Sequence, residues 1–320
     1  MIHKLNLLIG GIFIQIQSPY PNEEPRPAHF RKNIARFFVP PSPGKPEIRI
    51  QIERLKRPFP FPSKSTVFQT VRDHPSFSRS RRVIWKLAKK GDCYILAGNY
   101  WGKGIASEVS EDFGEATVFL NGQKELQETL RISDITHDFL QILLIHYLAQ
   151  KEKGILLHAT GVGDGRKGFL FYGPTRSGKT TLARLWRRHT PAHILGDDRI
   201  LVRREEKQFF IHATPWSGEF KEYCEREQTF AELSRAFFLQ GHSPSNRSQP
   251  LSARERFESL FPQCFLPFWN RPAVDFVSRF LADLSAAVPI EGLEFKDDEK
   301  VIDYVRSLSQ QKTRRAALPV

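Results

Sequence analysis

The sequence is short of cysteine, and this shortage limits the classes of protein it can belong to. Only three cysteines occur in 320 residues, Cys93, Cys224 and Cys264, and they form neither a Cys-x-x-Cys pair nor a metal-binding spacing. The motifs His-Glu-x-x-His and Gly-x-Ser-x-Gly are also missing, so a zinc protease or a serine hydrolase has no support. A sparse, odd set of cysteines argues against a disulfide framework and favours a reducing, cytoplasmic location.

Long apolar runs are missing as well. No stretch reaches the roughly 18 apolar residues that a membrane span requires. The first 18 residues, MIHKLNLLIGGIFIQIQS, leave two interpretations open. Lys4 and the apolar residues after it could form a signal peptide, but Asn6, Gln15 and Gln17 interrupt the run and no small-x-small cleavage site follows. Residues 12–16, IFIQI, favour an opening β-strand instead.

The charge balance is strongly basic, since 48 lysines and arginines outweigh 35 aspartates and glutamates and give a net charge of +13. Nucleic acid, an acidic peptide and a phosphate-bearing substrate are all partners that this balance allows. The basic residues are scattered, however, and the local runs at residues 79–82, 86–90 and 312–315 are too short to form a stripe. We expect a solvated basic surface and a basic tail at 311–320, not a nucleic-acid partner.

Residues 1–130 are expected to form a β-rich N-terminal domain. In residues 47–55 isoleucines alternate with polar residues, as in a half-buried strand. Residues 82–98 contain two apolar runs around Gly91-Asp92, which predicts a hairpin, and residues 115–126 predict a strand that runs into a turn. Three clusters of proline between residues 19 and 62 exclude continuous helix and central strand, so they are expected to be loops.

A change of hydrophobic period marks the passage to a second domain. Apolar residues in 134–150 recur on one helical face, and Asp134 is a suitable N-cap, so residues 131–152 are expected to contain a connecting helix. From 153 to 310 predicted strands and helices alternate, which indicates an α/β layer architecture. The predicted elements are strands in 155–162, 168–173, 193–204, 209–214, 236–239 and 288–295, and helices from Thr180, from the capping box Ser252-x-x-Glu255, over 272–287 and over 299–308.

The stretch GPTRSGKTT has the spacing of a phosphate-binding loop: glycine, four residues, glycine, lysine and threonine. An apolar run, GFLFY, precedes it and a predicted helix follows, which is the strand–loop–helix context that such a loop requires. The glycines allow backbone N–H groups to turn toward phosphate oxygens, and the helix N-terminus adds partial positive charge. The nine expected nucleotide-binding residues are Gly173, Pro174, Thr175, Arg176, Ser177, Gly178, Lys179, Thr180 and Thr181. Lys179 would reach the β- and γ-phosphates of ATP, and the Thr180 hydroxyl would bind Mg²⁺.

Two adjacent acids, Asp197 and Asp198, follow a short apolar run soon after the loop. A carboxylate at the end of a strand is a suitable Mg²⁺ partner for the loop threonine. Two carboxylates allow a division of labour, in which one binds metal and the other accepts a proton from an attacking hydroxyl. The alternative is that the pair only caps a turn.

These motifs resemble those of a known family. LLHATGVGDGRKGFLFYGPTRSGKTTLARL, followed closely by LGDDR, is similar to the catalytic domain of HPr kinase/phosphorylase, and more similar still to HPr kinase-like proteins of bacterial biosynthetic clusters. The resemblance is specific over residues 153–220 and looser to about residue 310. It implies a phosphoenolpyruvate-carboxykinase-like P-loop fold, and ATP- and Mg²⁺-dependent phosphorylation of a serine on a protein or on a ribosomal peptide precursor. The family's kinases form oligomers, so a homo-oligomer is one possibility here.

The resemblance also implies roles for individual residues. Asp198 matches the general base and Asp197 the acid beside it, which would bind metal with Thr180. His158 matches a histidine on the strand before the loop; from the sequence alone it could equally be a hydrogen-bonded core residue.

The match to the family is incomplete after the aspartates. The second signature of HPr kinase, Leu-Glu-x-Arg-Gly, is absent, and HATPWSGEF stands in the comparable place. Glu219 is a candidate replacement for the metal-binding glutamate of that signature, and Trp216 is expected in the core rather than in a lid. Arg247 could stabilise phosphoryl charge, although a solvated surface arginine is the simpler interpretation.

The sequence therefore favours a kinase that transfers the γ-phosphoryl group to a hydroxyl of a protein or peptide. One alternative is a nucleotide-responsive adaptor that binds a partner without phosphotransfer, with the β-rich domain as its docking surface. A plain ATPase, or a nucleic-acid enzyme supported only by the net charge, is the other.

Overall fold

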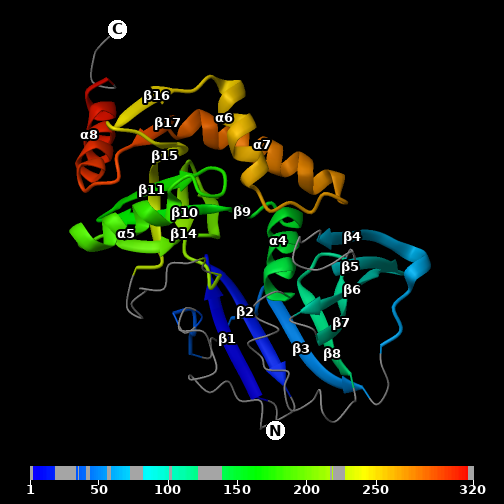
Figure 1. Ribbon diagram of the computed structural model, residues 1–320. Helices are drawn as coiled ribbons and strands as arrows, with labels where there is room; N and C mark the ends of the chain where they lie inside the picture. The colour runs from blue at the N-terminus through cyan, green and yellow to red at the C-terminus, as the bar shows by residue number, and fades with distance from the viewer. Residues whose placement is uncertain are drawn as a thin grey trace. The chain divides into compact units, whose positions relative to one another are not determined.

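The chain is mixed α/β with large sheets, and it divides into two compact units (Figure 1). The computed structural model describes residues 3–18, 34, 36–40, 44–55, 59–72, 82–100, 103–121, 139–216, 218 and 228–315. Unit 1 comprises Met1–Lys151 and Pro267–Arg271, and unit 2 comprises Glu152–Leu266 and Pro272–Val320. Within the described chain, none of the helices combines the length and the apolar character that crossing a membrane would need.

Unit 1 is built on an eight-stranded sheet in the order β1-β2-β3-β8-β7-β6-β5-β4. Neighbouring strands are antiparallel except at β2–β3 and β3–β8, which are parallel. The short 3₁₀ turn η3 (Ser63–Ser65) precedes β4. The strands are β1 (His3–Ile9), β2 (Ile12–Ser18), β3 (Ile48–Leu55), β4 (Thr66–Arg72), β5 (Arg82–Lys90), β6 (Cys93–Tyr100), β7 (Lys103–Ser110) and β8 (Glu115–Asn121).

The predicted strands and the predicted hairpin of the β-rich region are confirmed. Residues 12–16 lie in β2, which forms a hairpin with β1 that the sequence did not predict; its turn contains Gly10 and Gly11, whose φ angles of 56° and 77° favour glycine. The predicted hairpin, β5–β6, turns at Gly91 with φ 58°. The isoleucines of β2 and β3 at alternate positions are fully or almost fully buried, which is the half-buried face that the sequence pattern predicts: Ile12, Ile14, Ile16, Ile48, Ile50 and Ile52. Most residues of the proline clusters lie outside the described residues.

One helix and one distant segment complete the core of unit 1. The helix α4 (Leu140–Gln150) is the predicted connecting helix, while its predicted N-cap Asp134 lies outside the described residues. His146 of α4 uses both ring nitrogens, since Nδ1 lies 2.7 Å from the Ile142 carbonyl oxygen and Nε2 accepts from Trp269 Nε1 at 2.9 Å. Trp269 belongs to the segment Pro267–Arg271, so the chain returns to unit 1 after much of unit 2 has been traced.

Unit 2 is built on a nine-stranded mixed sheet whose main path is β12-β10-β11-β15-β14-β13-β9, with β17 beside β15 and β16 beside β17. Its strands are β9 (Ile155–Leu157), β10 (Ala159–Asp164), β11 (Lys167–Tyr172), β12 (His193–Gly196), β13 (Ile200–Glu205), β14 (Gln208–His212), β15 (Phe230–His242), β16 (Arg247–Pro250) and β17 (Ile290–Phe295). Its helices are α5 (Lys179–His189), α6 (Ala253–Leu260), the 3₁₀ turn η5 (Phe261–Gln263), α7 (Arg271–Ala287) and α8 (Lys300–Arg315).

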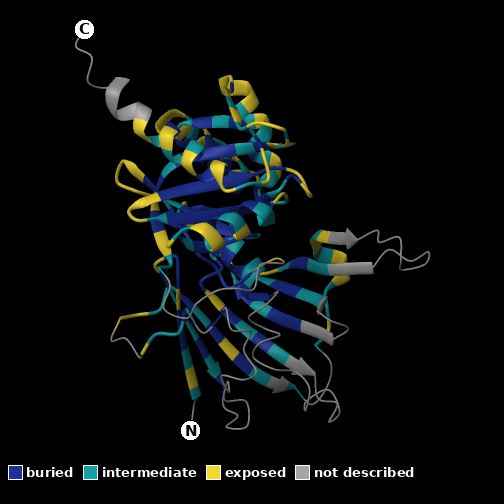
Figure 2. Ribbon diagram, turned by 60° about the vertical axis from the view of Figure 1, so that its left-hand side comes forward, coloured by how far each residue is buried: buried dark blue, intermediate teal, exposed yellow. Residues whose placement is uncertain are grey.

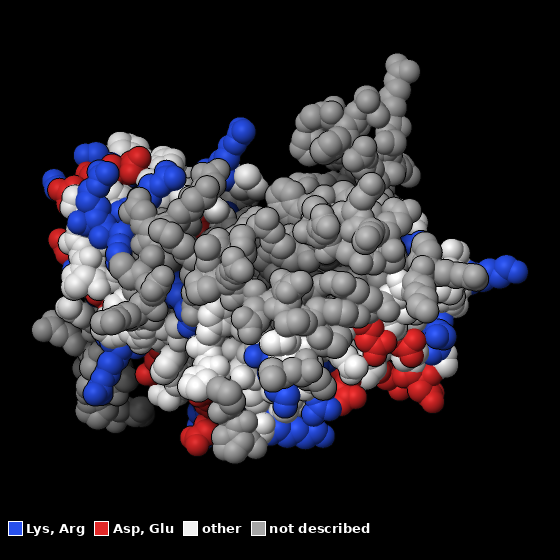
Figure 3. All heavy atoms as spheres, turned by 90° about the horizontal axis from the view of Figure 1, so that it is seen from below, with Lys and Arg blue, Asp and Glu red and all other residues white. Residues whose placement is uncertain are grey.

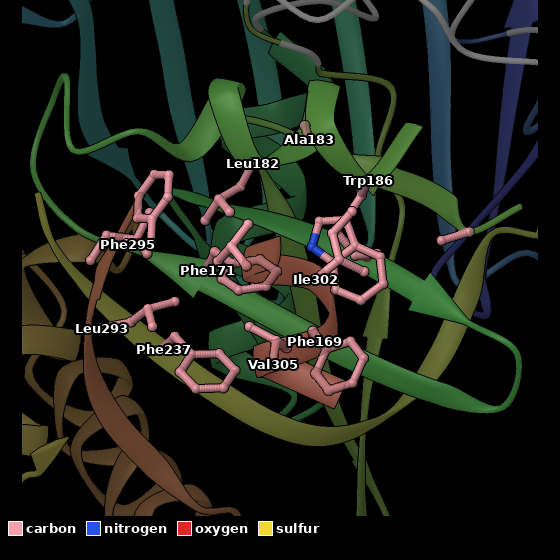
Figure 4. Packing of buried hydrophobic residues seen from close by; sticks show 14 of the residues in the cluster. Phe169, Phe171, Leu182, Ala183, Trp186, Phe237, Leu293, Phe295, Ile302 and Val305 are labelled. Carbon is pink, nitrogen blue, oxygen red and sulfur yellow. The ribbon is translucent and has the colours of Figure 1, made fainter. Parts of the chain in front are cut away.

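Helices cover both faces of this sheet. On one face, Phe169 and Phe171 of β11 pack in one cluster with Trp186 of α5 and Val305 of α8 (Figure 4). On the other face, the hydroxyl of Tyr172 lies 3.0 Å from a serine hydroxyl of α6, and the rings of Phe209 and Phe280 join β14 to α7. Most strand residues are buried, whereas the edge strand β16 and the outer faces of the helices are largely exposed (Figure 2). Each large apolar side chain in such a core contributes about 1.5–3 kcal/mol, so these layers fix the strand ends that carry the motif.

Most predicted strands and helices of unit 2 are present, including the capping box, in which Ser252 N–H donates to Glu255 Oε2 at 2.7 Å. Two predicted strands are each divided: 155–162 gives β9 and β10 on either side of His158, and 193–204 gives β12 and β13 on either side of residues 197–199. The strand β16 was not predicted. One prediction was too short: the strand expected at 236–239 is part of β15, which runs from Phe230 to His242. The full length of β15 cannot be seen in the sequence, because the charged residue Arg235 interrupts the apolar run. In the fold it is buried and paired with Glu291 of β17 at 2.5 Å, and it also donates to the Leu308 carbonyl.

We expect acid to weaken unit 1 through His146. Burial lowers its pKa to about 4 in the fold, against 6.5 for the free side chain, so its stabilising effect is complete above pH 6.5 and is lost as the pH falls toward 4. At pH 5 this histidine alone should lower the free energy of unfolding by about 2 kcal/mol relative to pH 7. Urea unfolding at both pH values measures the effect, and the change in tryptophan fluorescence as Trp269 becomes exposed follows the transition. His146→Phe should reduce the pH dependence, and His189→Ala, at an exposed site on α5, should leave it unchanged.

Candidate active site

The predicted phosphate loop joins a buried strand to a helix, as its motif requires. β11 ends at Tyr172, the loop begins at Gly173, and α5 begins at Lys179 with Gly178 as its N-cap. Gly173 and Gly178 have φ angles of 151° and 100°, and Arg176 lies in the left-handed region at 68°. These backbone angles curl the loop over the N-terminus of α5, where the first helical N–H groups lack helical partners and carry partial positive charge.

Lys179 is folded against the loop that it follows. Its Nζ donates to the carbonyl oxygens of Gly173 at 2.8 Å and Pro174 at 2.9 Å, and only 7% of the residue is exposed. Burial lowers the pKa of its ammonium. Ser177 is also buried, and its hydroxyl has no hydrogen-bond partner in the described part of the chain. The loop therefore holds a buried ammonium and a buried hydroxyl around the helix N-terminus, while Thr180 and Thr181 are half-buried.

The two predicted aspartates follow β12. Asp197 is 4% exposed, and its Oδ1 accepts the backbone N–H of Gly218 at 2.9 Å. The Gly218 Cα packs so closely that an added methyl group would lie 3.1 Å from Asp197 Oδ2 and 3.3 Å from Asp198 Cβ. Gly218 therefore covers the pair, a role for this glycine that the sequence did not reveal.

His158 and Asp198 are in contact. His158 lies between β9 and β10, and its Nε2 is 3.4 Å from Asp198 Oδ1. The backbone joins the same segments, since Ala159 N–H donates to the Asp198 carbonyl at 3.3 Å. Asp198 Oδ2 forms an ion pair with Arg199, whose guanidinium lies 4.9 Å from the centre of the Phe265 ring. The sequence interpretation missed Arg199, although it directly follows the two aspartates.

Electrostatics connects this cluster to the loop. The pKa of His158 falls to about 4, first because the ring is desolvated, and then because the positive charges of Lys179 and Arg199 oppose its protonation. Asp197 acts in the opposite direction and favours the protonated form. His158 is therefore neutral at neutral pH and lies within electrostatic range of both Lys179 and Asp197. The structure thus brings His158, Lys179, Asp197 and Asp198 together at one end of the unit 2 sheet.

The donor set fits magnesium better than a metal held by protein alone. Among the described residues, no group of three or more histidine, cysteine, aspartate or glutamate side chains could hold a metal. Magnesium usually takes one or two carboxylates and completes its six positions with water and substrate phosphates. The chemistry of the Asp197 carboxylate and the Thr180 hydroxyl is compatible with that kind of site.

Other predicted residues lie elsewhere or outside the description. Glu219 lies outside the described residues, so its predicted metal role stays a prediction. Arg247 is exposed in β16, opposite Glu294 of β17, as expected for a surface arginine. Trp216 is 2% exposed, as expected for a core residue.

Comparison with known proteins adds little to this geometry. No family model matches the chain, and no curated protein matches it. One solved structure that it matches is the Hpr(Ser) kinase/phosphatase from Coxiella burnetii, at 11% sequence identity and a TM-score of 0.28. The match covers 50% of this chain and 98% of that chain. A TM-score of this size carries no argument about fold or activity, so any functional assignment depends on the chain's own residues.

We expect the loop to tolerate no side chain at Gly178. A methyl group there would lie 2.5 Å from Phe295 Cζ, at a positive φ of 100°. Gly165→Ala is the matched control, since its φ of 63° carries the same kind of backbone strain but no atom lies within 4 Å. Both variants lose about 1–2 kcal/mol to backbone strain, and Gly178→Ala should lose about 1–3 kcal/mol more through overpacking. Urea unfolding measures the difference; equal losses would contradict the contact with Phe295.

Proposed function

We propose that this protein is an ATP- and Mg²⁺-dependent kinase with a phosphoenolpyruvate-carboxykinase-like P-loop catalytic unit, which transfers a γ-phosphoryl group to a serine or another hydroxyl of a protein or peptide. The observation that carries the proposal is the contact of His158 with Asp198 within electrostatic range of Lys179 and Asp197. A phosphate loop alone would fit any nucleotide-binding protein. An acid and a histidine in contact, with the histidine within electrostatic range of the loop lysine, supply what a transfer reaction needs in addition.

The phosphates would be bound by the loop and by the first turn of α5. Backbone N–H groups at a helix N-terminus bind phosphate oxygens, and Lys179 would exchange the carbonyls of Gly173 and Pro174 for the β- and γ-phosphates. The buried Ser177 hydroxyl is a further donor that has no protein partner among the described residues. These groups would neutralise charge on the phosphoryl group as it is transferred.

Thr180 and Asp197 would hold the magnesium ion. When bound, the ion neutralises charge on the β- and γ-phosphates. Asp197 is suited to this because Gly218 N–H already fixes one of its oxygens, which limits the rotation of the carboxylate. Thr180 follows Lys179 at the start of α5, the usual position for the metal-binding hydroxyl of a phosphate loop.

Asp198 would be the general base. Nε2 of the neutral His158 ring lies 3.4 Å from Asp198 Oδ1, and Asp198 Oδ2 forms an ion pair with Arg199, so both neighbours orient the carboxylate. The acceptor oxygen would form a bond to the γ-phosphorus as the bond from that phosphorus to the bridging oxygen of ADP breaks. The hydroxyl proton would pass to the carboxylate of Asp198, which has lone pairs beyond the one that pairs with Arg199.

The net charge of +13 suggests a nucleic-acid partner, but the local pairing of the basic side chains weakens this interpretation. In the run at 86–90, Lys89 pairs with Glu111 at 2.7 Å, Lys90 pairs with Glu108 at 3.2 Å, and Lys86 lies over the Phe61 ring. Basic and acidic side chains are interspersed on the face drawn in Figure 3. A protein or peptide acceptor and a possible homo-oligomer remain parts of the proposal that come from the family resemblance. The cytoplasmic location is proposed from the sparse cysteines.

The base assignment predicts a large, specific loss of transfer. Asp198→Asn keeps the shape of the side chain but removes its basicity, so transfer of label from γ-labelled ATP to a co-encoded peptide should fall by about 10²–10⁴-fold. Lys179→Ala should abolish nucleotide binding, whereas Asp275→Asn, at an exposed site on α7, should behave as the unmodified protein does. Undiminished transfer by Asp198→Asn would refute the assignment of Asp198 as the general base. Release of free phosphate with no labelled acceptor would indicate an ATPase, and ATP binding with neither product would indicate an adaptor.

A further inference from the structure

Two strands, β15 and β17, continue beyond the end of β11 and lie beside the phosphate loop. β11, β15 and β17 are parallel neighbours, so their carboxyl ends lie at the same edge of the sheet. The last residue of β11, Tyr172, pairs with Phe238, and β15 continues through residues 239–242, a length of about 13 Å. At the end of this extension His242 pairs with Phe295, the last residue of β17. Crevices at the carboxyl ends of parallel strands are where α/β sheets bind ligands.

The ends of β15 and β17 contact the loop at Gly178. A methyl group on Gly178 would lie 2.5 Å from Phe295 Cζ and 3.4 Å from His242 Nε2. Phe295 is fully buried and lies in the hydrophobic cluster with Leu182 of α5 (Figure 4). His242 is exposed, so its ring reaches the loop from the solvent side of Phe295.

The His242 ring is oriented, yet its nitrogens are unused. Its centre lies 4.8 Å from that of Phe295, with 52° between the ring planes. The backbone on either side is fixed, because Ser243 N–H donates to the Phe295 carbonyl at 2.9 Å and Lys296 N–H donates to Asn246 Oδ1 at 2.9 Å. Within the described chain, neither ring nitrogen of His242 makes a hydrogen bond to protein. An oriented imidazole beside a helix N-terminus is suited to donate to an anion there.

We propose that His242 binds the polyphosphate of the nucleotide, donating from Nε2 to a phosphate oxygen held by the loop; this inference rests on the proposed function. The position of Nε2 favours contact with a phosphate over contact with the nucleobase, because Gly178 directly precedes the helical N–H groups that bind phosphate. The motif does not include this histidine, which lies far from the loop in sequence and joins it only through the β11–β15–β17 pairing.

The test compares the affinities of five proteins, the unmodified chain and four variants including Lys179→Ala, for MgATP and for magnesium tripolyphosphate, which has no nucleoside, by calorimetry. His242→Ala should weaken both affinities by about tenfold, the effect of losing one hydrogen bond to a charged group. His242→Gln retains a donor and should recover most of the affinity. His189→Ala, at the opposite end of α5 about 15 Å away, is the matched control and should bind both ligands normally. In the transfer assay, His242→Ala should raise KM for ATP with little change in kcat.

The outcomes separate this inference from the proposed function. Unchanged affinity in His242→Ala, with binding abolished by Lys179→Ala, overturns the role of His242 and leaves the kinase proposal standing. A loss for MgATP but not for tripolyphosphate assigns His242 to the nucleoside and overturns the phosphate contact. Equal losses in the Ala and Gln variants, together with a lowered Tm, mean that His242 only supports Phe295. If the unmodified protein binds neither ligand, or Lys179→Ala binds as well as it does, the proposed function itself fails.

Discussion

The site depends on a balance of charge that the end of the unit 2 sheet can bury. Lys179 and Arg199 bring two positive charges, Asp197 and Asp198 bring two negative charges, and His158 stays neutral between them. Lys179 and Asp197 are almost fully buried, whereas Asp198, Arg199 and His158 are partly exposed, so loss of compensating charge would cost most at the two buried groups. The low pKa of His158 is a consequence of this arrangement, since a protonated ring would add a third positive charge to a desolvated site. A neutral ring also does not compete with Lys179 for phosphate, as a second cation would.

The order of the strands determines which residues can join this cluster. β10 lies between β11 and β12, so the loop after β11 and the aspartates after β12 leave the sheet on either side of the strand that follows His158. On the other side, β15 and β17 run parallel to β11 and extend past it. The loop is therefore flanked by acids on one side and by His242 and Phe295 on the other. Residues from five separate parts of the chain meet there because the sheet pairs their strands, while the buried aromatic cluster holds the strands in register.

Much of this could be predicted where local pattern decides the structure. The phosphate-loop spacing, the strand before it, the capping box and the alternation of strands and helices are all local features, and each is present. What local pattern could not provide was register. The full length of β15 was missed because Arg235 looks like a surface residue until Glu291 and the Leu308 carbonyl are paired with it. Gly218 and His242 were missed because their proximity to the site depends on pairings with distant segments.

The division into units imposes a further constraint on how the protein can be dissected. The sequence predicted a continuous catalytic domain over 153–310, whereas the fold assigns Pro267–Arg271 to unit 1. Within that segment Trp269 satisfies His146 Nε2 and packs 5.1 Å from the Tyr94 ring. A fragment ending at residue 151 would leave a buried imidazole nitrogen without its donor, a cost of about 1–3 kcal/mol, and would expose the aromatic surface that Trp269 covers. The core of unit 1 is thus complete only after most of unit 2 has been synthesised, which ties the folding of the β-rich region to the chain that carries the site.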